Sequence, residues 1–145
     1  MARNKMSIKF DGLEIYQKQL EKLGGGQAVK KAFDTALEES QALIAEKVSS
    51  AMAPHNKTGD VKASIISHEP PEWTGDIAEI NVGFDIVGGG LPSIFLMYGT
   101  QLFGQPHVQP DRNLYNAVYG PAVRRQVSEI QREAFTRVLN EVMKQ

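Results

Sequence analysis

Three histidines, His55, His68 and His107, are the side chains of this sequence best suited to bind a metal or transfer a proton. Metal motifs such as H-E-x-x-H place a second ligand at helical or hairpin spacing, and none of these histidines has one. The chain has no cysteine, so it offers no thiolate ligand, no disulfide and no cysteine nucleophile. We therefore expect no metal site, and we expect His55 and His107 to be solvent-exposed loop residues.

The arrangements that hydrolases use for covalent or acid–base catalysis are also missing from the sequence. No G-x-S-x-G motif is present, so no serine is predicted to lie on a nucleophile elbow. Two groups of carboxylates, Glu38-Glu39 and Glu69 with Glu72, have the residue types needed for acid–base work. Adjacent or loop carboxylates are equally common on solvated surfaces. The sequence predicts a protein that is not an enzyme and that uses no cofactor.

Four arginines near the end of the chain are the best candidates for a nucleic-acid-binding patch: Arg124, Arg125, Arg132 and Arg137. Three glutamates interrupt them, and Glu133 lies four residues before Arg137, the spacing of a helix-stabilising ion pair. Single-stranded nucleic acid also requires aromatic side chains for stacking beside such a patch. The pattern is more typical of a charged helix surface than of a nucleic-acid site.

The formal net charge of −1 is unevenly distributed along the chain. Residues 1–62 carry ten Lys and Arg against eight Asp and Glu, and residues 120–145 carry five against three, so each segment has a charge of +2. Residues 63–119 carry one Arg against six Asp and Glu, a charge of −5. Because phosphate groups are bound by Lys and Arg, the acidic middle argues against nucleic-acid binding there. A solvated acidic surface is the simplest interpretation of this segment.

The length of 145 residues, with 41% hydrophobic and 23% charged residues, indicates one globular domain. The first ten residues include basic side chains, but no apolar stretch follows them, so we expect no signal peptide. No run of about 20 apolar residues is present, so we expect no membrane span. Residues 1–9 are expected to be a flexible start that leads into a short extended piece, and residues 10–145 to form the domain.

Two long amphipathic helices dominate the hydrophobic pattern. Apolar residues recur every three or four positions over residues 27–52, and residues 122–143 repeat this pattern. Pro121 is suited to be the first residue of the second of these helices. Asp11 is a suitable N-cap for an earlier helix over residues 12–23, which three consecutive glycines end.

A small antiparallel sheet is predicted between the two long helices. Residues 61–67 alternate loosely and suit a first strand after one helical turn, and residues 77–82 alternate clearly after a hairpin turn at residues 73–76. The glycines at 88–90 then predict a flexible loop. The sequence therefore predicts an α+β fold, with a long N-terminal helix and a C-terminal helix packed on a small antiparallel β-sheet.

Residues 92–117 are predicted to form a rigid corner. An apolar run over residues 94–98 fits a short helix or a strand, and we favour the helix. The run stops at Gly99, and a loop with two prolines leads to a helix capped by Asp111. Each proline fixes its own φ and lacks an N–H donor, which stiffens the loop. The segment is therefore expected to present a loop in a fixed shape rather than to perform chemistry.

Three pieces of the sequence, in this order, resemble one protein family. They are Thr58-Gly59-Asp60-Val61-Lys62-Ala63-Ser64-Ile65, then Met97-Tyr98-Gly99-Thr100, then Pro106-His107 with Pro110 and the helix that begins at Asp111. Their order and spacing are similar to those of the HK97 gp10-like family of tailed-bacteriophage tail completion, neck or minor tail proteins. The resemblance covers nearly the whole chain from about Phe10. The chain departs from the family pattern at Met97-Tyr98, at Val108-Gln109 and at Gly120-Pro121.

The resemblance implies a non-enzymatic virion protein that forms a homo-oligomeric ring, usually sixfold or twelvefold, at the head–tail junction. Its partners would be further copies of itself, the head connector or adaptor, and the tail tube or terminator, all assembled in the cytoplasm of a bacterial host. DNA would pass through the lumen of the ring without specific binding, and no membrane would be involved.

The stiff corner supplies the candidate residues for the interface of such a ring: Tyr98, Gly99, Thr100, Phe103, Pro106, His107, Pro110 and Arg112. Glu79 and Asp85 are the candidates for a lumen that repels DNA. Residues 85–93 are expected to stay mobile until assembly. The alternatives are a tail terminator, a tail chaperone or other assembly accessory protein, a head-decoration protein, or a small nucleic-acid-binding phage protein.

Overall fold

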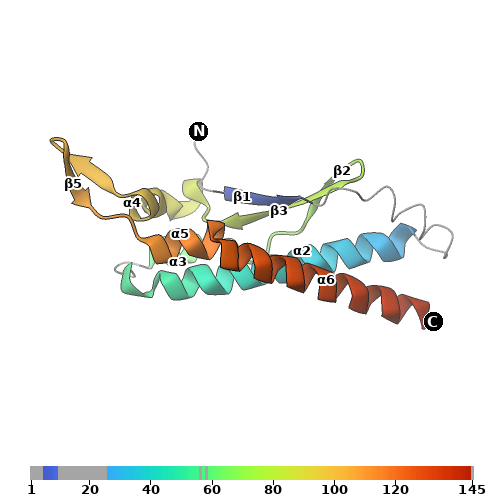
Figure 1. Cartoon of the computed structure of the whole chain (residues 1–145). Helices are drawn as coiled ribbons and strands as arrows, with labels where there is room; N and C mark the ends of the chain where they lie inside the picture. The colour runs from blue at the N-terminus through green and yellow to red at the C-terminus, as the bar shows by residue number, and fades with distance from the viewer. Residues whose placement is uncertain (1–4, 10–25, 56, 58, 145) are drawn as a thin grey trace.

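The computed structural model describes residues 5–9, 26–55, 57 and 59–144, and it has the α+β fold that the sequence predicts. Two long helices, α2 (Gly26–Ala51) and α6 (Pro121–Met143), lie side by side and antiparallel along an elongated molecule (Figure 1). A small antiparallel sheet packs on α2, which gives one layer of helices and one of strands. Within the described ranges, no helix is long and apolar enough to span a membrane.

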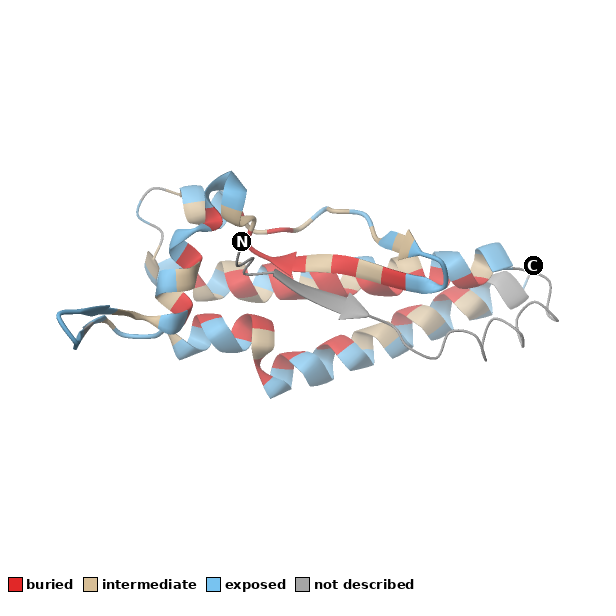
Figure 2. Ribbon diagram, turned by 90° about the horizontal axis from the view of Figure 1, so that it is seen from above, coloured by how far each residue is buried: buried red, intermediate tan, exposed pale blue. Residues whose placement is uncertain are grey.

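The apolar stripe predicted for residues 27–52 is confirmed, and it forms the centre of the core. Ten residues of α2 are buried at helical spacing: Val29, Ala32, Phe33, Ala36, Leu37, Ser40, Gln41, Ile44, Ala45 and Val48. Figure 2 shows the buried positions of α2 under the sheet. The polar Gln41 donates from Nε2 to the backbone carbonyl of Asn81 in the sheet at 2.6 Å. This bond satisfies the buried amide and joins the two layers.

The main sheet has three strands in the order β1 (Lys5–Lys9), β3 (Ile77–Gly83) and β2 (Glu72–Thr74). The central strand β3 pairs antiparallel with both neighbours and places Ile80 opposite Ile8. Its alternation is as predicted, because Ala78, Ile80 and Val82 are buried in the core while the residues between them are less buried. The flexible start expected for residues 1–9 therefore includes a paired strand.

A second, smaller cluster joins the N-terminal half of α2 to α6 and to the sheet. The ring of Phe33 lies 4.8 Å from Phe135 and 6.4 Å from Trp73, measured between centroids. The indole Nε1 of Trp73 donates to Asp34 Oδ1 at 2.7 Å. Arg137, expected to pair with Glu133, forms an ion pair with Glu39 of α2. Aromatic packing and polar contacts thus hold α6 against α2 at this end.

Residues 61–67 do not form the predicted first strand. The single-turn helix α3 (Asp60–Ala63) occupies the start of the segment, and Ile65 makes only an isolated bridge to Phe84. Two backbone hydrogen bonds flank this bridge, from the Ile66 N–H to the Gly83 carbonyl at 2.9 Å and from the Asp85 N–H to the Ser64 carbonyl at 2.8 Å. The segment therefore pairs with the end of β3 at a single bridge, which is too short to be a strand.

The flexible loop predicted at residues 88–90 is a folded turn. The segment η2 (Ile86–Gly90) closes with a π-type hydrogen bond, 2.8 Å long, from the Gly90 N–H to the Asp85 carbonyl. The Asp85 carboxylate accepts a second bond from the Gly88 N–H at 3.1 Å, and Gly90 is buried. The prediction is wrong because the Asp85 carboxylate caps the turn and holds the three glycines in a hydrogen-bonded conformation.

The remaining elements agree with the sequence where they are described. The short helix α4 (Pro92–Tyr98) follows η2, and α5 (Arg112–Tyr119) begins after its cap. Gly120 is extended, and Pro121 opens α6 as predicted. The predicted hairpin turn is also present and joins β2 to β3. The helix predicted over residues 12–23 lies outside the described residues.

Candidate functional site

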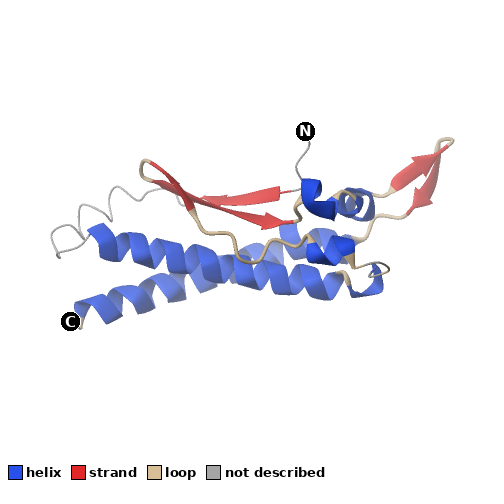
Figure 3. Ribbon diagram, turned by 180° about the vertical axis from the view of Figure 1, so that it is seen from behind, coloured by secondary structure: helices blue, strands red, loops and turns tan. Residues whose placement is uncertain are grey.

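A β-hairpin extends from the body of the molecule, where the sequence predicts an irregular loop. It consists of β4 (Thr100–Leu102) and β5 (Gln105–Val108), with Leu102 opposite Gln105 and Pro106 opposite Gln101. Figure 3 shows it standing apart from the three-stranded sheet. The loop prediction is wrong because the strands are short and one contains a proline, which is tolerated only in edge strands such as these.

The turn of this hairpin places an aromatic side chain in solvent at a backbone position that does not favour it. Phe103 and Gly104 are the two central residues, with φ values of 50° and 76°. Two-residue turns with both φ values positive favour Asn-Gly or Asp-Gly. A residue such as Phe loses about 1–2 kcal/mol in the left-handed region. Phe103 is 97% exposed, so packing within the chain does not offset this loss, and the residue is better explained by a contact with another molecule.

The base of the hairpin is held by close backbone contacts. Gly99 ends α4 with φ 74°, and a Cβ at this position would lie 2.5 Å from the Val108 carbonyl oxygen and 3.0 Å from Pro110 Cδ. The Asp111 N–H donates to the Leu96 carbonyl at 2.7 Å, which ties the return of the chain to α4. These contacts fix the direction in which the hairpin leaves the body.

Exposed apolar side chains continue from the hairpin over η2 and α4. Val87, Leu91, Phe95 and Tyr98 follow one another at helical spacing, and each is between 49% and 82% exposed. Tyr98 stacks edge-on against Tyr115 of α5, with ring centroids 5.9 Å apart. We name the following set the apolar face: Val87, Leu91, Phe95, Tyr98, Leu102, Phe103 and Tyr115.

The apolar face lies almost entirely within a stretch that carries no formal charge. Residues 86–110 are 25 residues long and contain no Asp, Glu, Lys or Arg, although such residues make up 23% of the chain. Exposed edge strands usually carry charges that prevent pairing with other chains. The cores of protein interfaces, by contrast, are depleted of charge and enriched in aromatic residues. This charge-free stretch is the feature of the sequence that could identify the apolar face. The net charge of residues 63–119 as a whole does not reveal it, because the acidic residues lie outside the stretch.

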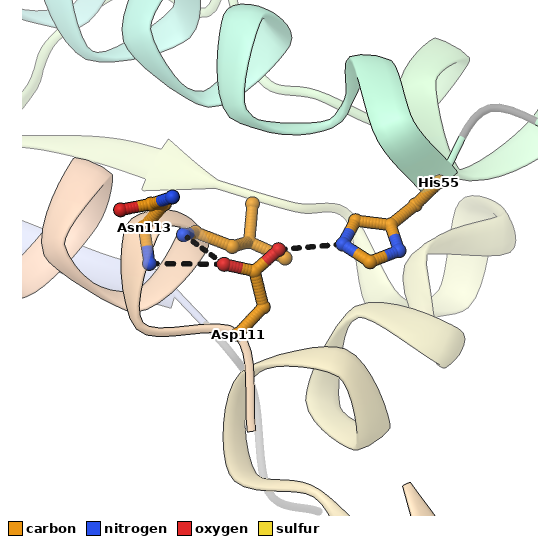
Figure 4. A network of polar contacts seen from close by, with 4 residues as sticks. His55, Asp111 and Asn113 are labelled. Atoms are coloured by element: carbon orange, nitrogen blue, oxygen red, sulfur yellow. Dashed lines mark hydrogen bonds and ion pairs between the residues drawn. The ribbon is translucent and has the colours of Figure 1, made fainter. Parts of the chain in front are cut away.

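Asp111 connects the start of α5 to the turn that follows α2 (Figure 4). Its Oδ1 accepts hydrogen bonds from the N–H groups of Asn113 at 2.9 Å and Leu114 at 3.1 Å, so it is the N-cap that the sequence predicts. Its Oδ2 lies 2.5 Å from His55 Nε2 in the 3-10 turn η1 (Ala53–His55). His55 was expected to be solvent-exposed, but its side chain is only 28% exposed because it turns toward this carboxylate.

The hydrogen bonds of Asp111 also determine its protonation. Burial alone would raise the pKa of this carboxyl, but the bonds from His55 and from the backbone N–H groups of Leu114 and Asn113 outweigh burial and lower the pKa. The pKa of Tyr119 is raised by burial and by the neighbouring phenol of Tyr98.

Most of the interface candidates predicted from the sequence lie together at the hairpin. Tyr98, Gly99, Thr100, Phe103, Pro106, His107 and Pro110 belong to the hairpin, its base or its approach, and Arg112 is exposed at the start of α5. His107 is exposed as expected, though it lies in β5 rather than in a loop. The hydroxyl of Thr100 is buried and has no hydrogen-bond partner among the described residues. Five members of the apolar face were not predicted from the sequence: Val87, Leu91, Phe95, Leu102 and Tyr115.

The two lumen candidates, Glu79 and Asp85, lie in different structural settings. Glu79 is half-buried in β3, where it lies opposite Lys9 on one side and Glu72 on the other. Asp85 lies beyond the end of that strand, and its carboxylate caps η2. Asp85 therefore has a structural role whether or not it also faces DNA.

Other kinds of site have little support in the part of the chain that is described. No group of three or more His, Cys, Asp or Glu side chains is placed there to hold a metal ion. A small hollow beside Trp73, of about 180 Å³, is lined by Gly26, Val29, Lys30, Trp73 and Gly75, and Lys30 is the one charged residue of this lining. Comparisons with models of known protein families, with curated proteins and with solved structures find no match to this chain.

Proposed function

We propose that this chain is a structural virion protein of a tailed phage or prophage, a tail completion or neck protein of the HK97 gp10-like kind. Copies of it would form a homo-oligomeric ring that joins the head connector to the tail. The proposal rests on the sequence resemblance and on one structural observation, the charge-free hairpin that exposes Phe103 almost completely. A side chain placed in this way serves contact between molecules better than it serves the fold.

The ring proposal also accounts for the shape of the corner. The hairpin is fixed at its base by Gly99 and by the Asp111 N–H, so little conformational entropy would be lost when it docks. The apolar face beside it provides area for a second subunit or for the connector. In this arrangement Glu79 would face the lumen and repel DNA, and charge reversal at Glu79 that leaves DNA ejection unchanged would count against that role.

A tail terminator or assembly accessory protein is the second candidate function. The same hairpin and apolar face would serve either role, because both require docking on other virion proteins. A nucleic-acid-binding role has less support, because Arg137 of the arginine group is paired with Glu39.

An early stop codon in the gene, in a phage or an induced prophage, tests the proposed function. Electron microscopy of the particles should show DNA-filled heads beside finished but unattached tails. Normal virions would refute the junction role, and heads without any tails would favour the terminator or accessory role. Complementation with the intact gene controls for effects on neighbouring genes.

A further inference from the structure

A groove between three helices has the chemistry to receive the hairpin tip. It has a volume of about 490 Å³ and is bounded by the C-terminal half of α2, by α5 and by the start of α6. Five apolar side chains from these three helices line it: Leu43, Ala51, Ala117, Ala122 and Val123. Pockets of roughly 300–1,000 Å³ enclose small ligands, so the groove has room for an aromatic side chain and a neighbouring leucine.

The charges of the groove and of the hairpin are compatible with contact. The charged residues that line the groove are Glu46 and Lys47, which are adjacent and of opposite sign. The hairpin has no Asp, Glu, Lys or Arg, so docking would bring no charge of the hairpin into the groove. The side-chain amides of Asn113 and Asn116 line the groove and provide hydrogen-bonding groups for the free edges of β4 or β5.

The hairpin cannot fill the groove of its own chain. Figures 1, 2 and 3 agree that it extends away from the helices, at one end of the molecule. A projection and a receiving groove at different places on one chain make a heterologous contact between copies, which closes into a ring if the rotation allows it.

The exposed area is also sufficient for such a contact. The four aromatic side chains of the apolar face expose about 500 Å² in total, if each is taken as about 200 Å² when fully exposed. A standard interface buries about 800 Å² on each partner. The three aliphatic members of the face, Val87, Leu91 and Leu102, are 51% to 82% exposed and add to this area.

We infer that the hairpin tip of one copy, with Leu102 and Phe103 as its anchor, docks in the α2–α5–α6 groove of the next copy. This inference rests on the proposed function, in which the copies form a ring, and it specifies the two surfaces that meet. Phe103 is then the central contact, and the rest of the apolar face lies against the neighbouring subunit around it.

Engineered cysteines test this contact directly, because the chain has no cysteine of its own. Gln105 lies beside the tip, so Gln105→Cys leaves both anchor residues intact. Ala122 is exposed and lines the groove, so Ala122→Cys places the second thiol there. The double variant should form a ladder of disulfide-linked oligomers under oxidation, and a mixture of the two single variants should stop at dimers. Ser128→Cys, exposed on α6 outside the groove, replaces Ala122→Cys in the matched control and should give no ladder.

The cross-linking is measured both on purified protein at increasing concentration and in cells that assemble particles. A ladder in either setting supports the contact, whereas its absence in both overturns it. Dimers from Gln105→Cys alone would also overturn it, because they would indicate a two-fold contact between hairpins. In a separate measurement, Phe103→Asn should weaken self-association about 30-fold or more, as loss of an anchor does.

The outcome for the contact is separable from the outcome for the proposed function. Unattached tails in the stop-codon mutant without a ladder would leave the junction role standing and refute the contact. A ladder together with normal virions in the stop-codon mutant would leave the contact standing and refute the junction role.

Discussion

His55 Nε2 lies 2.5 Å from Asp111 Oδ2, although 56 positions separate the two residues in the chain. An ionised carboxylate only accepts hydrogen bonds, so the Nε2–H of His55 is the donor. The other carboxylate oxygen caps α5 at the same time. One aspartate therefore joins the end of the α2 segment to the helix that follows the hairpin, and it anchors the return of the chain from the candidate interface.

Replacing Asp111 with alanine should destabilise the protein through loss of this cap. We expect the free energy of unfolding to fall by about 0.5–2 kcal/mol, because two N–H groups at the start of α5 lose their acceptor. Asp111→Asn is the matched control, since asparagine caps helices about as well as aspartate does. Chemical denaturation of both variants would measure the effect, and equal losses would show that the charge and not the cap is responsible.

The lowered pKa of Asp111 predicts a dependence of stability on pH. A carboxyl whose pKa is lower in the folded state stabilises the fold above its unfolded pKa, near 3.8, and loses this contribution as pH falls through the folded pKa. The difference in unfolding free energy between the natural protein and Asp111→Asn should therefore shrink as the pH falls below about 4. A difference that grows as the pH falls below about 4 would contradict the assignment.

The two long helices and β3 could be predicted from the sequence because each buries one face. The buried residues of α2 recur at helical spacing, and buried residues alternate with less buried ones along β3. The spacing of apolar residues therefore indicates which side of each element meets the core. The N-cap Asp111 and the first residue of α6, Pro121, were also predictable, because both depend on chemistry within one turn of the chain. Local patterns were sufficient wherever the element has a buried face.

The hairpin lacks both signals that identify hairpins in a sequence. Its strands are three and four residues long and mostly exposed, so no alternation marks them. Its turn is Phe103-Gly104 in place of the usual Asn-Gly, so the turn signal is absent as well. The residue that hides the turn in the sequence is the one we assign to binding.

The groove could not be predicted from the sequence for a different reason. Its lining comes from residues 43–51, 113–117 and 122–123, and only the packing of three helices brings these segments together. The apolar face was partly predictable, because the charge-free stretch of residues 86–110 is visible in the sequence. The charge-free stretch could therefore have indicated one of the two surfaces, whereas three-dimensional structure was needed for the other.

Gly99→Ala should loosen the base of the hairpin. The new Cβ would meet the Val108 carbonyl oxygen at 2.5 Å, in addition to the strain of alanine at φ 74°. Gly75→Ala is the matched control, because φ there is 61° and nothing lies within 4 Å of the added Cβ. Gly75→Ala should lose about 1–2 kcal/mol from its positive φ. Gly99→Ala should lose more, because its ψ of 174° lies in a region that glycine alone adopts readily and because of the contact with Val108. Equal losses in thermal or chemical unfolding would show that the contact with Val108 relaxes without cost.

Phe103→Asn should stabilise the isolated subunit while it removes the anchor for assembly. Asparagine tolerates the left-handed region that Phe103 occupies, so the free energy of unfolding should rise by about 1 kcal/mol. Little packing is lost, because the phenyl ring is 97% exposed. Phe103→Ala removes the same ring without relieving the backbone, so it should show no such gain. Unfolding is measured at concentrations where every variant is monomeric, and a loss of stability in Phe103→Asn would mean that the ring supports the fold of its own chain.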